Sequence, residues 1–184
     1  MRVGVVGKTG SGKTTFSALL AAAGAGRGRD VIAVDTDVSP NLAVSLGLGT
    51  EATAQVRTIP RAMARGRAGG AITTARVRRG YATLTPAGPL VLHAMPMGEE
   101  EAGCSCPAHA SARSLLADLL AEADLCVVDM EAGLDHLERS EGTLAHADAL
   151  LVVVEPTRKS TTVAGHVVAR SRGHGIGRLG VVGT

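Results

Sequence analysis

A glycine-rich run near the N-terminus has the residue types and spacing of a phosphate-binding loop. Residues 7–15 fit the pattern G-x-x-x-x-G-K-[ST] from Gly7 to Thr14. In such a loop the backbone N–H groups surround phosphate oxygens, Lys13 reaches the β- and γ-phosphates, and the Thr14 hydroxyl ligates Mg²⁺. The apolar residues 1–6 predict a strand before the loop and residues 16–23 a helix after it, which is the context that a P-loop requires. The residues expected to bind the nucleotide here are Gly7, Lys8, Thr9, Gly10, Ser11, Gly12, Lys13, Thr14 and Thr15.

Acidic residues follow two further apolar segments. Residues 31–34 predict a buried strand that ends at Asp35-Thr36-Asp37, and residues 125–128 predict another that ends at Asp129. Apolar residues followed by aspartate form a Walker B pattern, in which the carboxylate holds Mg²⁺ through water. An acidic side chain after the other strand can position water beside the γ-phosphate for in-line hydrolysis. Aspartate is also common in ordinary turns, so the P-loop is what favours the functional interpretation.

Two cysteines separated by one residue form a third candidate site. Cys104 and Cys106 would lie on one side of an extended segment, so both sulfurs can face the same ion. Two thiolates do not complete a tetrahedral Zn²⁺ or Ni²⁺ site, but two chains related by a two-fold axis would supply four. Taken alone, the pattern is equally consistent with two exposed thiols in a loop. The third cysteine, Cys126, falls inside an apolar strand and is expected to be a buried small hydrophobe.

Composition narrows the class of protein. The chain has 184 residues, 45 % of them hydrophobic, with one Phe, one Tyr and no Trp. Stacking on nucleic-acid bases therefore has almost no aromatic side chains to use, and we expect no nucleic-acid partner. The net charge is only +2, and the arginines between residues 57 and 79 are expected to form a solvated face. No apolar run reaches the roughly 18 residues of a membrane span, so we expect no membrane partner.

The order of elements predicts an α/β fold. Apolar strands are expected at 1–6, 31–34, 90–94, 125–128, 149–154 and 179–182, and helices at 16–23, 41–46, 112–123, 134–146 and 160–172. Residues 47–88 are expected to be mostly irregular, with a short helix near 59–64 and a hairpin around 81–84. Apolar strands alternating with helices predict a parallel sheet covered on both faces. The carboxyl ends of its strands would bring Gly7, Asp35, Asp129 and Glu155 to one edge, where ligands bind.

Three features resemble known ATPases. Lys8, directly after the first glycine, resembles the deviant Walker A motif of the MinD/ParA-like ATPases. Residues 129–137 (DMEAGLDHL) resemble the D-M-E-A-G-[IL]-[ED]-H-L signature of the CooC-type ATPases that mature nickel carbon monoxide dehydrogenase. The C-x-C ahead of a predicted helix, before the Walker B strand, is also similar to that group. Glu138 departs from the pattern, since a glycine is expected there.

The resemblance implies a fold and a set of roles. The fold would be a three-layer P-loop NTPase, with residues 1–184 as a single ATPase domain in the cytoplasm. ATP would bind at the P-loop with Asp35 and Asp129 as further contacts, and Lys8, Lys13 and Asp37 would be catalytic. Lys8 would reach the nucleotide of a partner subunit and Asp37 would orient the attacking water. The chain would form a homodimer on binding ATP or metal, and nickel carbon monoxide dehydrogenase would be its client.

Two other functions stay open on the sequence. One is a ParA/MinD-type positioning ATPase, which would act as a switch and would need an amphipathic helix or a basic surface. The other resembles the nitrogenase iron protein, which takes one cysteine from each of two separated segments; Cys104 and Cys106 are too close together for that. In relatives, an adenine-binding Asn-Lys follows the last strand, so that element is expected beyond Thr184.

Overall fold

The apolar segments of the chain form an eight-stranded sheet in a computed structural model, which describes residues 1–37, 40–59, 74–94, 122–130, 147–173, 176 and 178–184. The strands are β1 (Arg2–Gly7), β2 (Val31–Asp35), β3 (Thr58–Ile59), β4 (Thr83–Leu84), β5 (Leu90–Ala94), β6 (Leu125–Asp129), β7 (Ala149–Val154) and β8 (Leu179–Gly183). The described helices are α1 (Lys13–Ala25), α2 (Leu42–Ser45), α3 (Thr50–Ala54), α5 (Thr74–Tyr81) and α9 (Arg158–Gly173). Outside residues 47–88, the strands and helices predicted in these ranges are confirmed to within a few residues at their ends.

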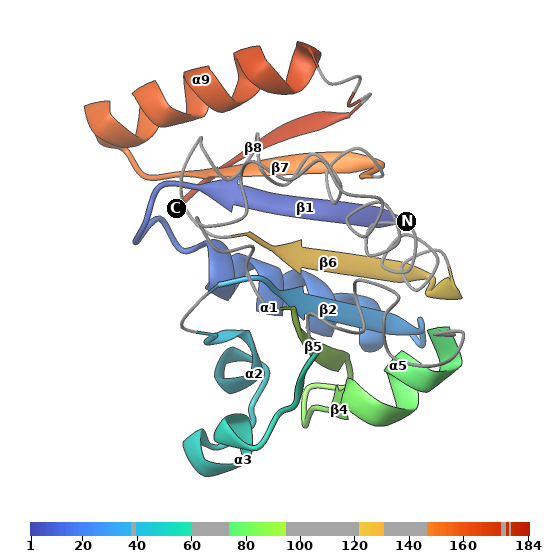
Figure 1. The fold of residues 1–184 in the computed structure, drawn as a ribbon. Helices are drawn as coiled ribbons and strands as arrows, with labels where there is room; N and C mark the ends of the chain where they lie inside the picture. The colour runs from blue at the N-terminus through green and yellow to red at the C-terminus, as the bar shows by residue number, and fades with distance from the viewer. Residues whose placement is uncertain (38–39, 60–73, 95–121, 131–146, 174–175, 177) are drawn as a thin grey trace, which may run out of the picture.

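The order of strands places the P-loop near the middle of the sheet. The order is β3-β5-β2-β6-β1-β7-β8, all parallel, with β4 antiparallel to β5 at the side. Val5 of β1 and Asp35 of β2 both pair with Asp129 of β6, so these three strands end level with one another. Their carboxyl ends lie at one edge of the sheet, and the C-terminus lies at that edge while the N-terminus lies at the other (Figure 1). The expected convergence of strand ends is therefore confirmed.

Helices cover both faces of the sheet. Because side chains alternate along a strand, Val3 and Val5 of β1 join one buried cluster while Val6 joins another. The first cluster contains residues of α1 and α2, and the second contains residues of α5 and α9. Both consist almost entirely of Val, Leu, Ala and Ile, as the scarcity of aromatic residues requires. The predicted three-layer α/β architecture is confirmed.

The segment expected to be irregular contains more structure than its sequence indicates. Ile59 was expected to begin a helix, but it pairs with Ala94 and is buried in the short parallel strand β3, so this prediction is wrong at Ile59. Helices α3 and α5 were missed, because α3 buries none of its side chains and α5 buries only Val77. Their apolar periodicity is too weak to detect. The hairpin is present as β4 and β5, although Tyr81 ends α5 instead of starting a strand.

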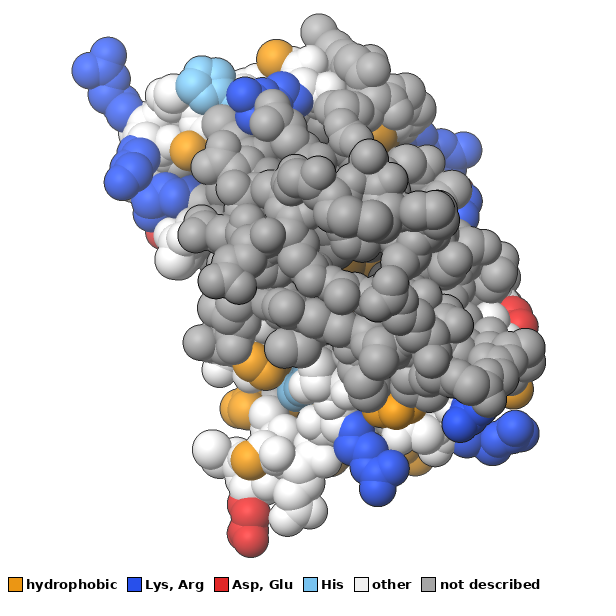
Figure 2. Space-filling model, in the orientation of Figure 1, with side chains coloured by type: hydrophobic (Ala, Val, Ile, Leu, Met, Phe, Trp, Pro, Cys, Tyr) orange, Lys and Arg blue, Asp and Glu red, His pale blue; other side chains and the backbone are white. Residues whose placement is uncertain are grey.

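Some predictions fall outside the described residues. They are the helix at 134–146, most of the helix at 112–123, residues 60–64 of the helix expected near 59–64, and the loop that contains Cys104 and Cys106. On the face seen in Figure 2, Lys and Arg side chains lie over the beginning of α9 and around α5, and others lie at the margin of the view. Arg78 of α5 is ion-paired with Asp30. Within the described ranges, no helix has the length and hydropathy needed to cross a membrane.

Two helical glycines offer a matched test of the packing of this fold. A Cβ at Gly24 of α1 would lie 2.7 Å from Leu125 Cδ2 and 3.1 Å from Val31 Cγ2, whereas a Cβ at Gly165 of α9 would meet nothing within 4 Å. We expect Gly24→Leu to lower the free energy of unfolding by about 1–3 kcal/mol through overpacking. The same change at the exposed Gly165, Gly165→Leu, should raise it by up to about 1 kcal/mol through helix propensity. Urea denaturation monitored by circular dichroism measures both, and equal effects of the two variants would contradict the close approach of α1 to the sheet.

Candidate nucleotide site

The loop between β1 and α1 has the backbone of a phosphate cradle. Gly10 and Gly12 have φ values of +84° and +87°, a conformation that residues with a side chain rarely adopt. Helix α1 begins at Lys13 directly after Gly12, and no side chain caps its N-terminus. The first N–H groups of a helix lack partners within the helix, and together with the helix dipole they favour an anion at this point. The loop geometry therefore suits a phosphate group.

Gly7 permits the close approach of β1 and β7 under this loop. A Cβ at Gly7 would lie 2.4 Å from the carbonyl oxygen of Val153 and 2.8 Å from Ser11 Oγ. The first of these atoms belongs to the backbone of the neighbouring strand and cannot move aside without breaking the sheet. The first glycine of the P-loop pattern is thus required by packing at the end of β7, in addition to any contact with phosphate.

Lys13 is a buried cation at the centre of the site. Its side chain is largely enclosed, and Nζ donates a hydrogen bond to the carbonyl oxygen of Lys8 at 3.2 Å. Burial lowers the pKa of Lys13, while the carboxylates of Asp129 and Asp37 raise it and the charge of Lys8 lowers it. The ammonium group therefore lies within electrostatic reach of both carboxylates for which the sequence predicts chemistry.

Asp129 and Thr14 supply oxygen ligands of the kind that Mg²⁺ prefers. The pKa of Asp129 is raised to about 6, mainly by burial and also by the neighbouring Asp35. Hydrogen bonds from Thr14 and Ser17 and the charge of Lys13 act in the opposite direction and lower this pKa. Ser17 Oγ lies 3.0 Å from Asp129 Oδ1. A carboxylate and a hydroxyl beside each other are hard oxygen donors, so this pair fits a magnesium ion.

The acidic segment after β2 is anchored to the sheet. Asp35 accepts hydrogen bonds from the backbone N–H groups of Asp37 at Oδ1 (3.0 Å) and of Leu42 at Oδ2 (2.9 Å). Both oxygens of Asp35 are therefore engaged with the protein itself, which gives Asp35 a role in shaping the loop that carries Asp37. The N–H and hydroxyl groups of Thr36 both donate to the carbonyl oxygen of Asp129, at 3.1 and 2.9 Å.

Two of these residues were missed by sequence reasoning. Ser17 lies three positions after Thr14 on α1, so helical spacing predicts that the two share a face. Thr36 lies between the two aspartates and has no recognisable motif of its own. Both bind Asp129, one at the side chain and one at the backbone, and thereby fix the end of β6 against α1 and the loop after β2.

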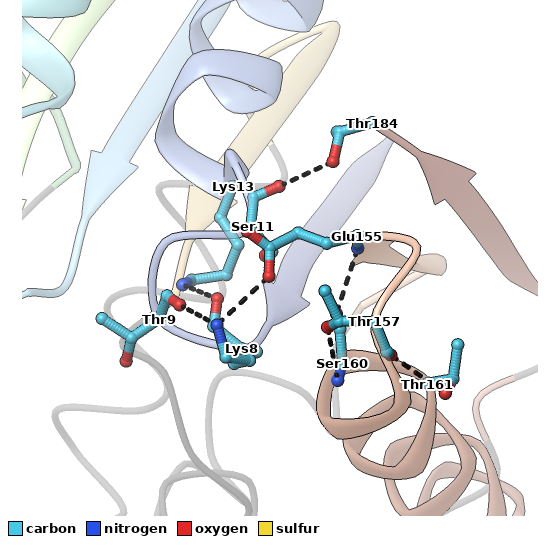
Figure 3. A network of polar contacts seen from close by, with 9 residues as sticks. All are labelled: Lys8, Thr9, Ser11, Lys13, Glu155, Thr157, Ser160, Thr161 and Thr184. Carbon is cyan, nitrogen blue, oxygen red and sulfur yellow. Dashed lines mark hydrogen bonds and ion pairs between the residues drawn. The ribbon is translucent and has the colours of Figure 1, made fainter.

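Lys8 lies at the outer side of the loop and contacts the end of β7. Its Nζ donates to the carbonyl oxygen of Thr9 at 3.0 Å and forms an ion pair with Glu155 Oε2 at 3.1 Å (Figure 3). The sequence places Glu155 at this edge but predicts no partner for it. Lys8 and Lys13 thus point to different parts of the site, one to the adjacent strand β7 and one into the loop.

The cysteines divide between described and undescribed parts of the chain. Cys126 is fully buried in β6, and burial raises the pKa of its thiol to about 12. Its predicted place in the apolar core is confirmed. Cys104 and Cys106 lie outside the described residues, so their role as metal ligands stays a prediction. Among the residues that the structure does describe, no group of three or more His, Cys, Asp or Glu side chains forms a metal site.

Comparisons with known proteins agree with this geometry. Residues 4–179 match the CobQ/CobB/MinD/ParA nucleotide binding domain. The chain is 33 % identical to the carbon monoxide dehydrogenase accessory protein CooC of Rhodospirillum rubrum, over 96 % of this chain and 71 % of that protein. It is 31 % identical to an uncharacterized ATP-binding protein of Methanocaldococcus jannaschii, over 99 % of this chain and 74 % of the relative.

Solved structures share the fold at lower identity. One is the septum site-determining protein MinD of Pyrococcus horikoshii, complexed with Mg-ADP, which has a TM-score of 0.69 at 22 % identity. The match covers 98 % of this chain and 68 % of the MinD chain. Another is cobyrinic acid a,c-diamide synthase of Mycobacterium smegmatis, with bound ADP and magnesium, which has a TM-score of 0.66 at 19 % identity. This match covers 99 % of this chain and 73 % of the synthase chain. Taken with its sequence relatives, the chain belongs to the CobQ/CobB/MinD/ParA family of nucleotide-binding domains and, within that family, is a CooC-type P-loop ATPase of the MinD/ParA-like group.

Proposed function

We propose that this chain is an ATP-dependent metallochaperone, which hydrolyses ATP as a dimer and helps to insert nickel into carbon monoxide dehydrogenase. The observation that carries the ATPase part is the convergence of Lys13, Thr14, Asp37 and Asp129 around one phosphate-binding loop. The metal and client parts rest on the Cys104-x-Cys106 pair and on the similarity to the CooC protein of Rhodospirillum rubrum. We assign the chain to the cytoplasm, where ATP is available.

The residues of the loop would bind and orient the triphosphate. The N–H groups of residues 7–15 and the N-terminus of α1 hold phosphate oxygens, and the Lys13 ammonium neutralises charge on the β- and γ-phosphates. Burial strengthens this electrostatic contact, because the surroundings of Lys13 screen charge less than water does. Asp37 holds the attacking water in line with the γ-phosphate, and Asp35 keeps Asp37 in place through its backbone N–H.

Thr14 and Asp129 would hold the magnesium ion, the latter through water. When bound, Mg²⁺ supplies positive charge that stabilises the phosphate oxygens during transfer. Asp129 has its carboxylate form above a pH of about 6, where it can serve this purpose. The hydroxyl of Ser17 keeps the carboxylate oriented by its hydrogen bond to Oδ1.

Nickel or zinc would be cargo carried between two subunits. Each chain offers Cys104 and Cys106 as adjacent thiolates, and a two-fold axis would bring four together in the tetrahedral set that Zn²⁺ takes. Cys126 is unsuited to ligate metal because it is enclosed in the core on β6. A positioning ATPase of the MinD type is the alternative, and metal binding at the two loop cysteines distinguishes the two functions.

The roles of Lys13 and Asp37 differ in a measurable way. Lys13→Ala removes the main cation for the phosphates and should weaken Mg-ATP binding about 30-fold, the range for a lost hydrogen bond to a charged group. Asp37→Ala should leave the dissociation constant within about threefold and slow turnover about 100-fold, because it removes a group that acts on the attacking water. Calorimetry measures the change in the dissociation constant, and a phosphate-release assay measures the change in turnover.

Lys159→Ala, at an exposed position on α9, is the control and should match wild type in both assays. Wild-type turnover in Asp37→Ala would refute the water-positioning role.

The role of Lys8 concerns assembly. If Lys8 reaches the partner's nucleotide, Lys8→Ala should bind Mg-ATP with near wild-type affinity as a monomer and fail to dimerise. Analytical ultracentrifugation at saturating Mg-ATP, with a hydrolysis-deficient Asp37→Ala background to hold the nucleotide intact, measures this. If the Lys8→Ala protein dimerises as tightly as its parent, then Lys8 does not act on the nucleotide of the partner subunit.

Metal binding should accompany assembly. We expect about one Zn²⁺ or Ni²⁺ per dimer, because four thiolates complete one tetrahedral site. The double variant Cys104→Ala/Cys106→Ala should lose the metal, and the matched Cys126→Ala should retain it. Affinity should fall as pH drops, since thiolates must lose a proton to bind. Metal analysis by mass spectrometry across size-exclusion fractions measures the stoichiometry. Tight stoichiometric metal on a monomer would contradict the shared site.

A further inference from the structure

Lys8 is held on its own subunit by two contacts. An ammonium group has three protons to donate, and Lys8 Nζ directs one to the carbonyl oxygen of Thr9 at 3.0 Å and one to Glu155 Oε2 at 3.1 Å (Figure 3). The side chains of Lys8 and Glu155 are 27 % and 28 % exposed. The pair is therefore enclosed enough for the charges to attract appreciably and exposed enough for either side chain to leave.

The fold fixes the place of the glutamate. Gly7 pairs with Val153 in the parallel register of β1 and β7, so both chains leave the sheet next to each other. The backbone N–H of Glu155 donates to Ser160 Oγ at 3.0 Å, and the N–H of Ser160 donates to Thr157 Oγ1 at 3.2 Å. Ser160 is only 1 % exposed. These hydrogen bonds to the buried Ser160, in the first turn of α9, keep Glu155 beside the P-loop regardless of what its side chain binds.

Glu155 also balances charge within the loop. Lys8 and Lys13 lie in one short loop, where Lys13 Nζ is 3.2 Å from the carbonyl oxygen of Lys8. Like charges repel, so burial and, to a smaller extent, the charge of Lys8 lower the pKa of Lys13. A carboxylate against Lys8 offsets part of that repulsion on the side away from Lys13. A triphosphate on a second subunit offers Lys8 more negative charge than one carboxylate does, so it can displace Glu155.

We propose that Glu155 is a positioning residue that holds Lys8 back from the dimer interface and thereby sets the ATP concentration at which two chains assemble. This inference rests on the proposed function, in which Lys8 binds the partner's nucleotide. Lys8 exchanges its intramolecular ion pair for the phosphates across the two-fold axis, and each subunit must release one lysine. Dimerisation is thus coupled to the breaking of two Lys8–Glu155 pairs.

The size of the effect follows from the exposure of the pair. A partly exposed ion pair is worth a few tenths of a kcal/mol to 1 kcal/mol, which corresponds to about a threefold change per subunit. Two pairs break per symmetric dimer, so loss of Glu155 should raise the association constant about tenfold. The difference between wild type and variant should shrink as salt is added, because salt screens the pair.

The experiment compares Glu155→Gln with wild type in two assays. Glutamine keeps the size and a hydrogen-bond acceptor and removes the charge. First, brief acetylation without nucleotide, followed by mass spectrometry, should show Lys8 modified about threefold faster in Glu155→Gln, with Lys159 as the internal reference. Second, sedimentation at graded Mg-ATP should show about tenfold tighter dimerisation. Glu51→Gln, the same change at an exposed position on α3, should match wild type in both assays.

The two assays together separate the ion pair from general electrostatics. If Glu155 restrains Lys8, then Glu155→Gln should both expose Lys8 to acetylation and tighten the dimer. A tighter dimer without faster acetylation of Lys8 would mean that Glu155 acts only as a nearby negative charge, and would overturn the proposal. Unchanged acetylation, or unchanged or weaker dimerisation, would overturn it as well. A wild-type chain that stays monomeric with Mg-ATP would instead overturn the proposed function, and this inference with it.

Discussion

The parallel pairing of β1 with β6 on one side and β7 on the other is the constraint on which the site depends. It brings the ends of these strands level, so that the P-loop leaves the sheet between Asp129 and Glu155. Hydrogen bonds along the strands set this register, and the apolar alternation of β1 supports it, because a shift by one residue would exchange the two buried clusters. The chemistry of the loop is therefore fixed by a sheet that contains almost no polar side chains until its edge.

At that edge the charges are arranged in pairs of opposite sign. Lys13 is buried near Asp129 and Asp37, and Lys8 is paired with Glu155. Burial opposes the charged form of both Lys13 and Asp129, and each is partly compensated by the other. Such an arrangement favours an anionic ligand together with a divalent cation, because phosphate attracts the lysine side chains and Mg²⁺ attracts the carboxylates. Ser17 bonds to the carboxylate of Asp129, and Thr36 donates to the backbone carbonyl oxygen of the same residue. Asp35 accepts from the backbone N–H of Asp37. These bonds fix the two segments that carry the carboxylates.

The fold, and the residues at the carboxyl edge of the sheet, could be predicted from the sequence wherever a local pattern alone determines the structure. Continuous apolar strands such as residues 149–154 and the glycine spacing of the P-loop leave little alternative. Sequence reasoning failed where pairing partners decide the conformation, as at Ile59, which forms a strand only because Ala94 lies beside it. It also failed to foresee the contact between Lys8 and Glu155, because 147 residues separate them and no motif joins them. Ser17 was within reach of helical spacing, whereas Thr36 carries no signal of its own.

The central claim is that this edge of the sheet binds a nucleotide through its triphosphate. Isothermal titration calorimetry of the wild-type chain with ATP and with AMP, both with Mg²⁺, tests it most directly. The loop and Lys13 act on phosphates that AMP lacks, so we expect ATP to bind at one site per chain and AMP to bind at least about 100-fold more weakly. Equal affinities for the two nucleotides, or no binding of Mg-ATP, would contradict this account.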